Sequence, residues 1–150
     1  AKAELARAHG CDHVINYASE NFTQRVRDIT GGKGVAVVYD GVGKDTFTGS
    51  LDSLRPMGMM VSYGNASGPV PPVDLILLSQ KGSLFITRPT LMTYTAQRAD
   101  LLELGRELFD RVASGQLRIE VNQRYALRDA AQAHRDLEAR KTTGSTILLP

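Results

Sequence analysis

Val35-Ala36-Val37-Val38-Tyr39-Asp40-Gly41-Val42-Gly43 is the stretch that decides the fold of this 150-residue chain. Its first five residues form a continuous apolar run rich in β-branched residues, which is typical of a strand buried on both faces of a parallel sheet. The small residues that follow are typical of the turn from such a strand into a helix. The stretch therefore predicts an α/β fold built on a parallel sheet.

Helices and strands alternate on either side of this strand. The patterns predict helices at 2–9, 19–30, 45–54, 73–80, 98–114 and 129–140, and strands at 13–16, 59–63, 83–87, 123–127 and 145–149. Ser19 is the expected cap of the second helix, and 56–58 is the expected turn before the next strand. Leu101, Leu104, Leu108 and Val112 share one face of the long helix, which we expect to pack inward. Alternation at this spacing indicates right-handed βαβ crossovers.

Composition excludes several classes of protein. The net charge of +2, from 18 basic and 16 acidic residues, gives no basic stripe, so a nucleic-acid partner is not expected. No apolar run approaches the roughly 18 residues that a membrane span needs, and no membrane partner is expected. A single cysteine, Cys11, excludes a disulfide framework and a site of several thiolates. These features indicate a reducing compartment, and we expect a cytoplasmic protein.

Polar and small residues follow the predicted strands. They are Asn16-Tyr17, Asp40-Gly41-Val42-Gly43, Tyr63-Gly64-Asn65 and Thr87-Arg88. Ligands of open α/β sheets bind outside the carboxyl ends of the strands. Gly41, Gly43 and Gly64 would let the backbone approach a ligand with no Cβ between them. The alternative interpretation is that these are ordinary strand-to-helix turns, which need glycine in any case.

The strong signature of dinucleotide binding is missing from the sequence, because no G-x-G-x-x-G occurs in it. Gly31-Gly32-Lys33-Gly34 precedes a strand, whereas a phosphate-binding loop follows one, so we interpret it as the end of a helix and a turn. Either the chain does not bind a nucleotide, or the glycine motif lies upstream of Ala1.

Motifs along the whole chain carry a family resemblance. They include Gly10-Cys11-Asp12-His13-Val14-Ile15-Asn16-Tyr17, Val38-Tyr39-Asp40-Gly41-Val42-Gly43, Ser62-Tyr63-Gly64-Asn65-Ala66-Ser67-Gly68 and Leu127-Arg128-Asp129-Ala130-Ala131-Gln132-Ala133-His134. In this order they closely resemble the NADPH-dependent quinone oxidoreductases, the zeta-crystallin-like, zinc-less branch of the medium-chain dehydrogenase/reductases.

The resemblance implies a domain organisation. Chains of that family are about twice as long, with a GroES-like catalytic domain and a glycine motif before the region matched here. We therefore expect residues 1–115 to form a partial Rossmann-type parallel sheet with flanking helices. Residues 116–150 would be a C-terminal return segment that packs on the catalytic domain. The 150-residue piece alone would then be inactive.

The resemblance also implies a cofactor site for NADPH. Lys2 and Tyr17 would lie near the 2′-phosphate, and an ammonium group there would favour NADPH over NADH. The remaining expected cofactor-binding residues are Gly41 and Val42 on the adenosine side, Gly64, Asn65 and Ser67 nearer the nicotinamide, Phe85, Ile86 and Thr87 beside it, and Arg140 from the return segment. No catalytic residue and no metal ligand is assigned.

The function that the resemblance implies is hydride transfer from NADPH to a quinone or an enone by a zinc-independent oxidoreductase. The strand at 83–87 would pair with its twofold mate in a homodimer. Two alternatives stay open: an enoyl or alkenal reductase of the same superfamily, and a non-catalytic module for nucleotide binding or dimerisation.

Overall fold

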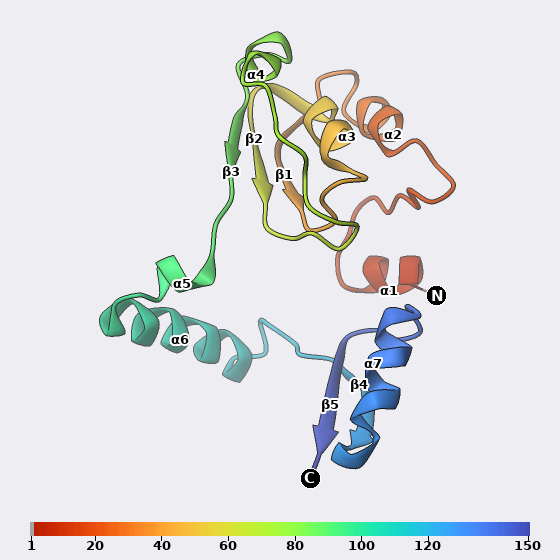
Figure 1. Cartoon of the computed structure of the whole chain (residues 1–150), viewed down its shortest axis with the longest axis vertical. Coiled ribbons are helices and arrows are strands. Elements are labelled where there is room, and N and C mark those ends of the chain that lie inside the picture. Colours follow the sequence, from red (N-terminus) through yellow and green to blue (C-terminus); the bar gives the residue numbers. More distant parts are fainter. Residues whose placement is uncertain (1) are drawn as a thin grey trace. The chain divides into compact units, whose positions relative to one another are not determined.

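The computed structural model describes residues 2–150, which divide into two compact units. One unit holds residues 3–93, and the other holds residues 94–150 together with Lys2. Each contains helices and a parallel sheet (Figure 1), so the predicted α/β class is confirmed.

The helices and strands alternate over most of the chain. In order they are α1 (Lys2–Ala8), α2 (Phe22–Ile29), β1 (Val35–Asp40), α3 (Phe47–Asp52), β2 (Leu54–Ser62), α4 (Ile76–Gln80), β3 (Phe85–Thr87), α5 (Leu91–Tyr94), α6 (Arg98–Ala113), β4 (Val121–Ala126), η1 (Leu127–Asp129), α7 (Ala130–Glu138) and β5 (Ser145–Leu149). Helix α5 is an element that sequence patterns did not predict.

The sheet of the first unit has the order β1-β2-β3, and all three strands run parallel (Figure 1). Its register aligns Val38 with Met60 and Met60 with Ile86. Because side chains alternate along a strand, this row lies on one face. Met60 is fully buried there, and Val38 and Ile86 pack against the core around it.

Helix α3 supplies the other half of that core. Phe47 and Leu51 are buried on it, and they pack with Leu54, Met60 and Leu84. Helix α2 lies on the outside of α3 (Figure 1), where the Thr23 hydroxyl donates to the Gly49 carbonyl at 3.3 Å. The core thus joins one face of the sheet to α3, and this contact places the start of α3 beside the end of β1.

The opposite face of the sheet is open, and here the prediction of a strand buried on both sides is wrong. The next row in the register is Val37, Met59 and Phe85, whose side chains are all exposed. Tyr39 on the same face is also exposed. A β-branched run predicts a strand that suits burial, but burial also requires an element that covers the second face.

Three local predictions also need correction. Residues 13–16 form no strand, since no strand of the described residues pairs with them. The cap of α2 is Asn21 rather than Ser19, because the Asn21 side chain accepts from the Gln24 amide. Strand β2 begins at Leu54 and runs through the expected turn at 56–58, with a register shift against β1.

The second unit contains a two-stranded parallel sheet of β4 and β5. The Tyr125 hydroxyl on β4 donates to the Asp136 carboxylate on α7 at 3.1 Å.

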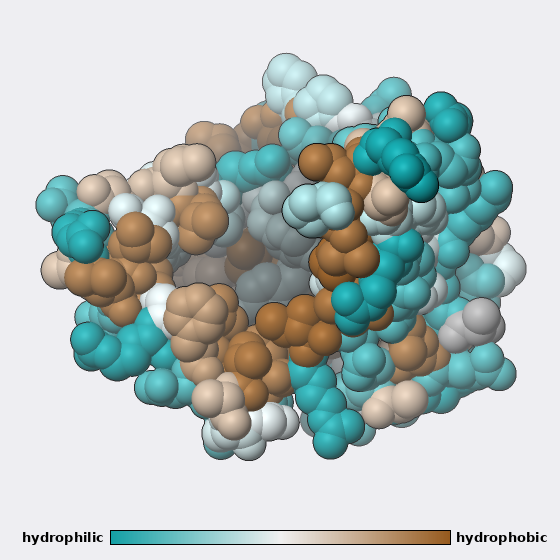
Figure 2. All heavy atoms as spheres, turned by 90° about the horizontal axis from the view of Figure 1, so that it is seen from below, coloured by the Kyte–Doolittle hydropathy of each residue, from teal (hydrophilic) through white to brown (hydrophobic). Residues whose placement is uncertain are grey.

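Helix α6 has no buried residue, and Leu101, Leu104 and Leu108 are exposed, so the predicted inward packing of these leucines is wrong. Apolar side chains are also exposed on the face of the molecule that Figure 2 shows. Periodicity identifies an apolar face of a helix and leaves open what covers it.

Among residues 2–150, no helix combines the length and the apolar composition that crossing a membrane requires.

Two consecutive methionines of β2 test the assignment of the two sheet faces. Met60→Ala should lower the free energy of unfolding by about 2–5 kcal/mol, because it leaves a cavity in the core. Met59→Ala is the matched control on the open face and should lower it by less than about 1 kcal/mol. Urea unfolding of both variants measures the difference, and an equal loss would contradict the assignment.

Candidate functional site

Two loops at the carboxyl ends of β1 and β2 are hydrogen-bonded to each other. We call residues 41–46 the first loop and residues 63–68 the second loop. The Ala66 amide donates to the Gly41 carbonyl at 3.3 Å, and the Ser67 amide and hydroxyl both donate to the Val42 carbonyl, at 2.8 and 2.9 Å. In return, the Lys44 amide donates to the Gly68 carbonyl at 3.1 Å. The loops therefore form one interlocked structure.

The side chain of Asp40 lies beneath the first loop and is 4% exposed. Its Oδ1 accepts hydrogen bonds from the amides of Val42 and Gly43, at 2.8 and 3.0 Å. Its Oδ2 accepts from the hydroxyls of Thr46 and Ser50, at 2.8 and 2.6 Å. These donors come from the first loop and from α3, so the carboxylate ties the loop to the helix that follows it.

Two opposing effects act on the pKa of Asp40. Burial alone would raise that pKa, whereas the hydrogen bonds from Ser50, Gly43, Thr46 and Val42 stabilise the charged form, and together they lower the pKa below its ordinary value. Asp40 is therefore an ionised carboxylate at neutral pH, and it is held by neutral donors.

Glycines at this edge of the sheet are required by contacts within the protein. A Cβ on Gly64 would lie 2.4 Å from the Gly41 carbonyl oxygen, and a Cβ on Gly43 would lie 2.6 Å from the Gly68 carbonyl oxygen. A Cβ on Gly41 would meet the Tyr63 ring at 2.9 Å. The close approach that glycine permits in this structure is between the two loops, and the predicted approach of Gly41 and Gly64 to a ligand stays a prediction.

A first cleft of about 230 Å³ opens beside the first loop. Three residues expected to bind cofactor line it: Tyr17, Gly41 and Val42. Aromatic side chains of Phe22 and Tyr39 complete a largely apolar wall. Residues of two separate segments therefore line one cleft, and their contact with a cofactor stays a prediction.

A second cleft of about 550 Å³ lies beside the second loop. It contains Asn65 and Ile86 from the expected site, and its other walls are mainly apolar. Arg88 supplies the positive charge in this cleft, and its Nη1 donates to the carbonyls of Ser62 and Gly64, each at 3.1 Å. The guanidinium therefore joins the end of β3 to the end of β2.

Six expected site residues line neither cleft. Gly64 and Ser67 lie in the second loop, where the Ser67 hydroxyl is committed to Val42 and Asp45. Phe85 and Thr87 alternate with Ile86 and are both exposed. Lys2 is exposed on α1, and Arg140 is exposed just after α7, in the second unit.

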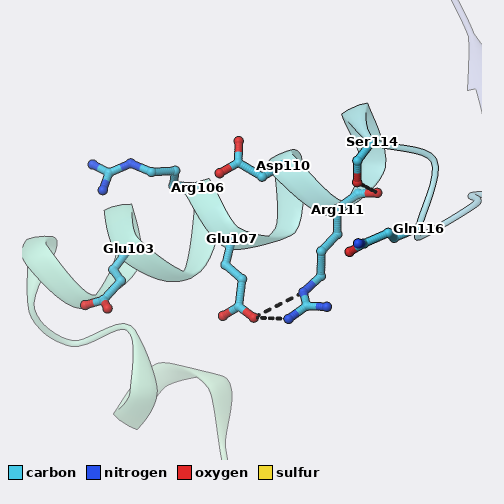
Figure 3. Close-up of a pocket in the computed structure, with 7 residues that line it drawn as sticks. All are labelled: Glu103, Arg106, Glu107, Asp110, Arg111, Ser114 and Gln116. Carbon is cyan, nitrogen blue, oxygen red and sulfur yellow. Dashed lines mark hydrogen bonds and ion pairs between the residues drawn. The ribbon is translucent and has the colours of Figure 1, made fainter.

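Another surface depression runs along α6 and is lined by charged residues of that one helix and its C-terminal end (Figure 3). Glu107 and Arg111 form an ion pair at 2.7 Å across one turn, while the Glu103, Arg106 and Asp110 side chains spread apart. Charges four residues apart on an exposed helix are ordinary surface features.

Within residues 2–150, no group of three or more His, Cys, Asp or Glu side chains is placed to hold a metal ion.

Sequence reasoning missed the residues that organise the two loops. Asp40 was noted as the end of a strand and received no role, and the same is true of Arg88. One signal was available for Asp40, since a carboxylate directly after a buried apolar run needs donors nearby. Thr46, directly before α3, and Ser50, on α3, could supply them.

Comparisons with known proteins agree with this architecture. A family model described as zinc-binding dehydrogenase matches residues 9–148. The quinone oxidoreductase of Pseudomonas aeruginosa is 55% identical over 99% of this chain, and 2-haloacrylate reductase of a Burkholderia species is 51% identical over 99%. The crystal structure of Escherichia coli quinone oxidoreductase complexed with NADPH superposes with a TM-score of 0.94 at 50% identity, over 99% of this chain. The chain spans only 46%, 45% and 46% of these three proteins, respectively.

Acid titration tests the state of Asp40. Because its native pKa lies below the ordinary value of 3.8, the ionised group stabilises the fold above that pH, and this contribution is lost as the pH falls through the native pKa. Asp40→Asn removes this titration, so its free energy of unfolding should fall less steeply below about pH 4 than that of the unmodified chain. Urea unfolding from pH 3 to pH 7 measures both slopes. The control is Asp45→Asn, at an exposed position; equal acid slopes for Asp40→Asn and the unmodified chain would contradict the assignment.

Substitution of glycines tests the close approach of the loops. Gly64→Ala should lower the free energy of unfolding by about 1–3 kcal/mol, since its Cβ meets backbone that cannot move freely. Gly41→Ala should have a smaller effect, because the exposed Tyr63 ring can rotate away. Gly105 lies in the middle of α6, and no atom other than the neighbouring helix backbone lies within 4 Å of a Cβ added there. Gly105→Ala should therefore stabilise the chain by up to about 1 kcal/mol. Thermal and urea unfolding rank the three variants; a tolerated Gly64→Ala would refute the contact.

Proposed function

The chain belongs to the zinc-binding dehydrogenase family, and on this premise we propose that the full protein transfers a hydride from NADPH to a quinone. The observation that carries the proposal is the 55% identity to a quinone oxidoreductase over 99% of this chain. The clefts at the carboxyl ends of a parallel sheet support it, because this edge is where open α/β sheets bind nucleotides.

The residues of the first cleft fit the adenosine half of NADPH. An apolar wall with the Tyr17 and Phe22 rings suits a flat base, and Gly41 presents backbone without a side chain. Tyr17, Gly41 and Val42 would hold this half. We keep Lys2 as the proposed partner of the 2′-phosphate, on the strength of the family resemblance and of its exposed ammonium group.

The residues of the second cleft fit the nicotinamide half and a quinone ring. Mainly apolar walls with the amide of Asn65 and the guanidinium of Arg88 suit flat rings that carry a few polar atoms. Asn65 and Ile86 would border the nicotinamide, Gly64 and Ser67 would shape the second loop, and Phe85, Thr87 and Arg140 are proposed to contact the cofactor from outside the cleft. NADPH supplies the hydride. The chain binds and orients NADPH, and the apolar walls of the cleft exclude water from it.

We assign residues 1–115 to the nucleotide-binding domain and residues 116–150 to a segment that packs on the catalytic domain. Zinc-independence stays a prediction for the full protein. A cytoplasmic location is proposed as well, and is supported by the free, exposed thiol of Cys11, which a reducing compartment would preserve.

A homodimer through β3 is proposed from the geometry of the sheet. Strand β3 pairs with β2 on one side and lies at the edge of the sheet on the other, with Phe85 exposed beside that edge. An open edge of this kind can pair with the same strand of a second copy. Sedimentation of the full protein checks this, and a monomer at micromolar concentration would exclude it.

Steady-state kinetics of the full protein test the proposed activity. We expect a higher kcat/KM with 1,4-benzoquinone than with 2-alkenals, and with NADPH than with NADH. Lys2→Ala should raise KM for NADPH about tenfold and leave KM for NADH unchanged, because it removes a charge-assisted contact to the phosphate. Lys33→Ala, in the turn before β1, is the control.

Either of two outcomes would contradict the proposal. Faster turnover of 2-alkenals would favour the alternative, an enoyl or alkenal reductase. Absence of turnover with both substrate classes would favour a non-catalytic nucleotide-binding or dimerisation module.

A further inference from the structure

We infer that Asp40 is a positioning residue for NADPH: its buried carboxylate sets the relative position of the two loops and so shapes both clefts. The inference rests on the proposed function, since it concerns the cofactor that these clefts are proposed to bind.

Asp40 is one of the residues that line the first cleft, but protein donors occupy its carboxylate oxygens, so it acts through these donors rather than through a bond to the cofactor. Four protein groups already donate to its two oxygens, and the side chain is 4% exposed. An ionised carboxylate has about four lone-pair sites, so little capacity remains for a ribose hydroxyl. Any effect on the cofactor must therefore pass through the backbone that the carboxylate holds.

The route from Asp40 to the second loop runs through two peptide planes. The Val42 amide and the Gly41 carbonyl belong to one planar peptide unit, and the Gly43 amide and the Val42 carbonyl belong to the next. Oδ1 of Asp40 accepts from both amides. Because the N–H and C=O of a trans peptide point in opposite directions, fixing both amides also directs both carbonyls away from Asp40.

Those two carbonyls accept hydrogen bonds from the second loop. The Gly41 carbonyl accepts from the Ala66 amide, and the Val42 carbonyl accepts from the amide and the hydroxyl of Ser67. Asn65, which lines the second cleft, directly precedes these residues. A single carboxylate thus sets the backbone of the first cleft directly and that of the second cleft through the interlocked loops.

Loss of the carboxylate would release this arrangement. Asp40→Ala leaves the amides of Val42 and Gly43 without their acceptor, and such groups then turn toward water or toward other partners. Asp40→Asn is the conservative variant, because its amide oxygen can accept from both backbone amides while its amide nitrogen donates to the Thr46 and Ser50 hydroxyls. Geometry is kept and charge is removed.

The test measures NADPH binding and turnover in the full protein. Asp40→Ala should raise Kd for NADPH about tenfold, with kcat at saturating NADPH within about twofold of the unmodified protein, because Asp40 touches no reacting atom. Asp40→Asn should restore Kd to within about threefold. Fluorescence titration gives Kd, and thermal unfolding confirms that each variant is folded at the assay temperature.

Two serines of the α3 region provide the matched control. Ser50 and Ser53 are both buried, and each hydroxyl donates one hydrogen bond, Ser50 to Asp40 at 2.6 Å and Ser53 to the Gly49 carbonyl at 2.8 Å. Ser50 also lines the first cleft, but its hydroxyl proton is directed to Asp40 rather than into the cleft. Ser50→Ala should raise Kd for NADPH by about threefold or more. Ser53→Ala should leave it unchanged while lowering Tm to a similar extent.

The outcomes separate the inference from the proposed function. If Asp40→Ala and Ser50→Ala lower Tm and leave Kd for NADPH unchanged, Asp40 is only structural and the inference is overturned. Should Asp40→Ala fail to fold, the comparison of Ser50→Ala with Ser53→Ala decides in the same way. If the unmodified protein binds no NADPH, the proposed function itself fails, and the inference fails with it.

Discussion

The buried carboxylate of Asp40 is the interaction on which the geometry of the candidate site depends. An unpaired carboxylate is costly to bury, and this one is stabilised by two peptide amides and two hydroxyls instead of a cation. These neutral donors stabilise the negative charge of Asp40, and because each must point at the carboxylate, they also set the orientation of the backbone and side chains that carry them. The end of β1, the first loop and the start of α3 are therefore held as one rigid corner.

The glycines around this corner also help to hold the two loops in place. Gly64 passes so close to the Gly41 carbonyl that a Cβ would overlap it, and Gly43 lies nearly as close to the Gly68 carbonyl. This proximity brings the backbone groups of the two loops within hydrogen-bonding distance of each other. A motif such as Asp-Gly-Val-Gly can thus mark loop–loop packing and still lie beside a ligand cleft, because the packed loops form the walls of that cleft.

The surfaces of the two units are consistent with a chain that spans about half of its relatives' length. The outer face of β1, β2 and β3 and the leucine face of α6 are both apolar and exposed. Parallel sheets are normally covered on both faces. These faces account for the two clearest failures of prediction: a side chain's preference for burial was identified correctly, but not the element that would have to cover it.

The sequence by itself determined most of the helices and strands and the parallel class of the sheet. These depend on local periodicity and on the spacing of βαβ units. The grouping of Tyr17 with Gly41 and Val42 followed from the family resemblance. Only the tertiary structure decided that residues 13–16 form no strand, that one face of the first sheet is exposed, and that Asp40 anchors both loops. Strand pairing, burial and the acceptors of a carboxylate depend on groups distant along the chain, which no local pattern contains.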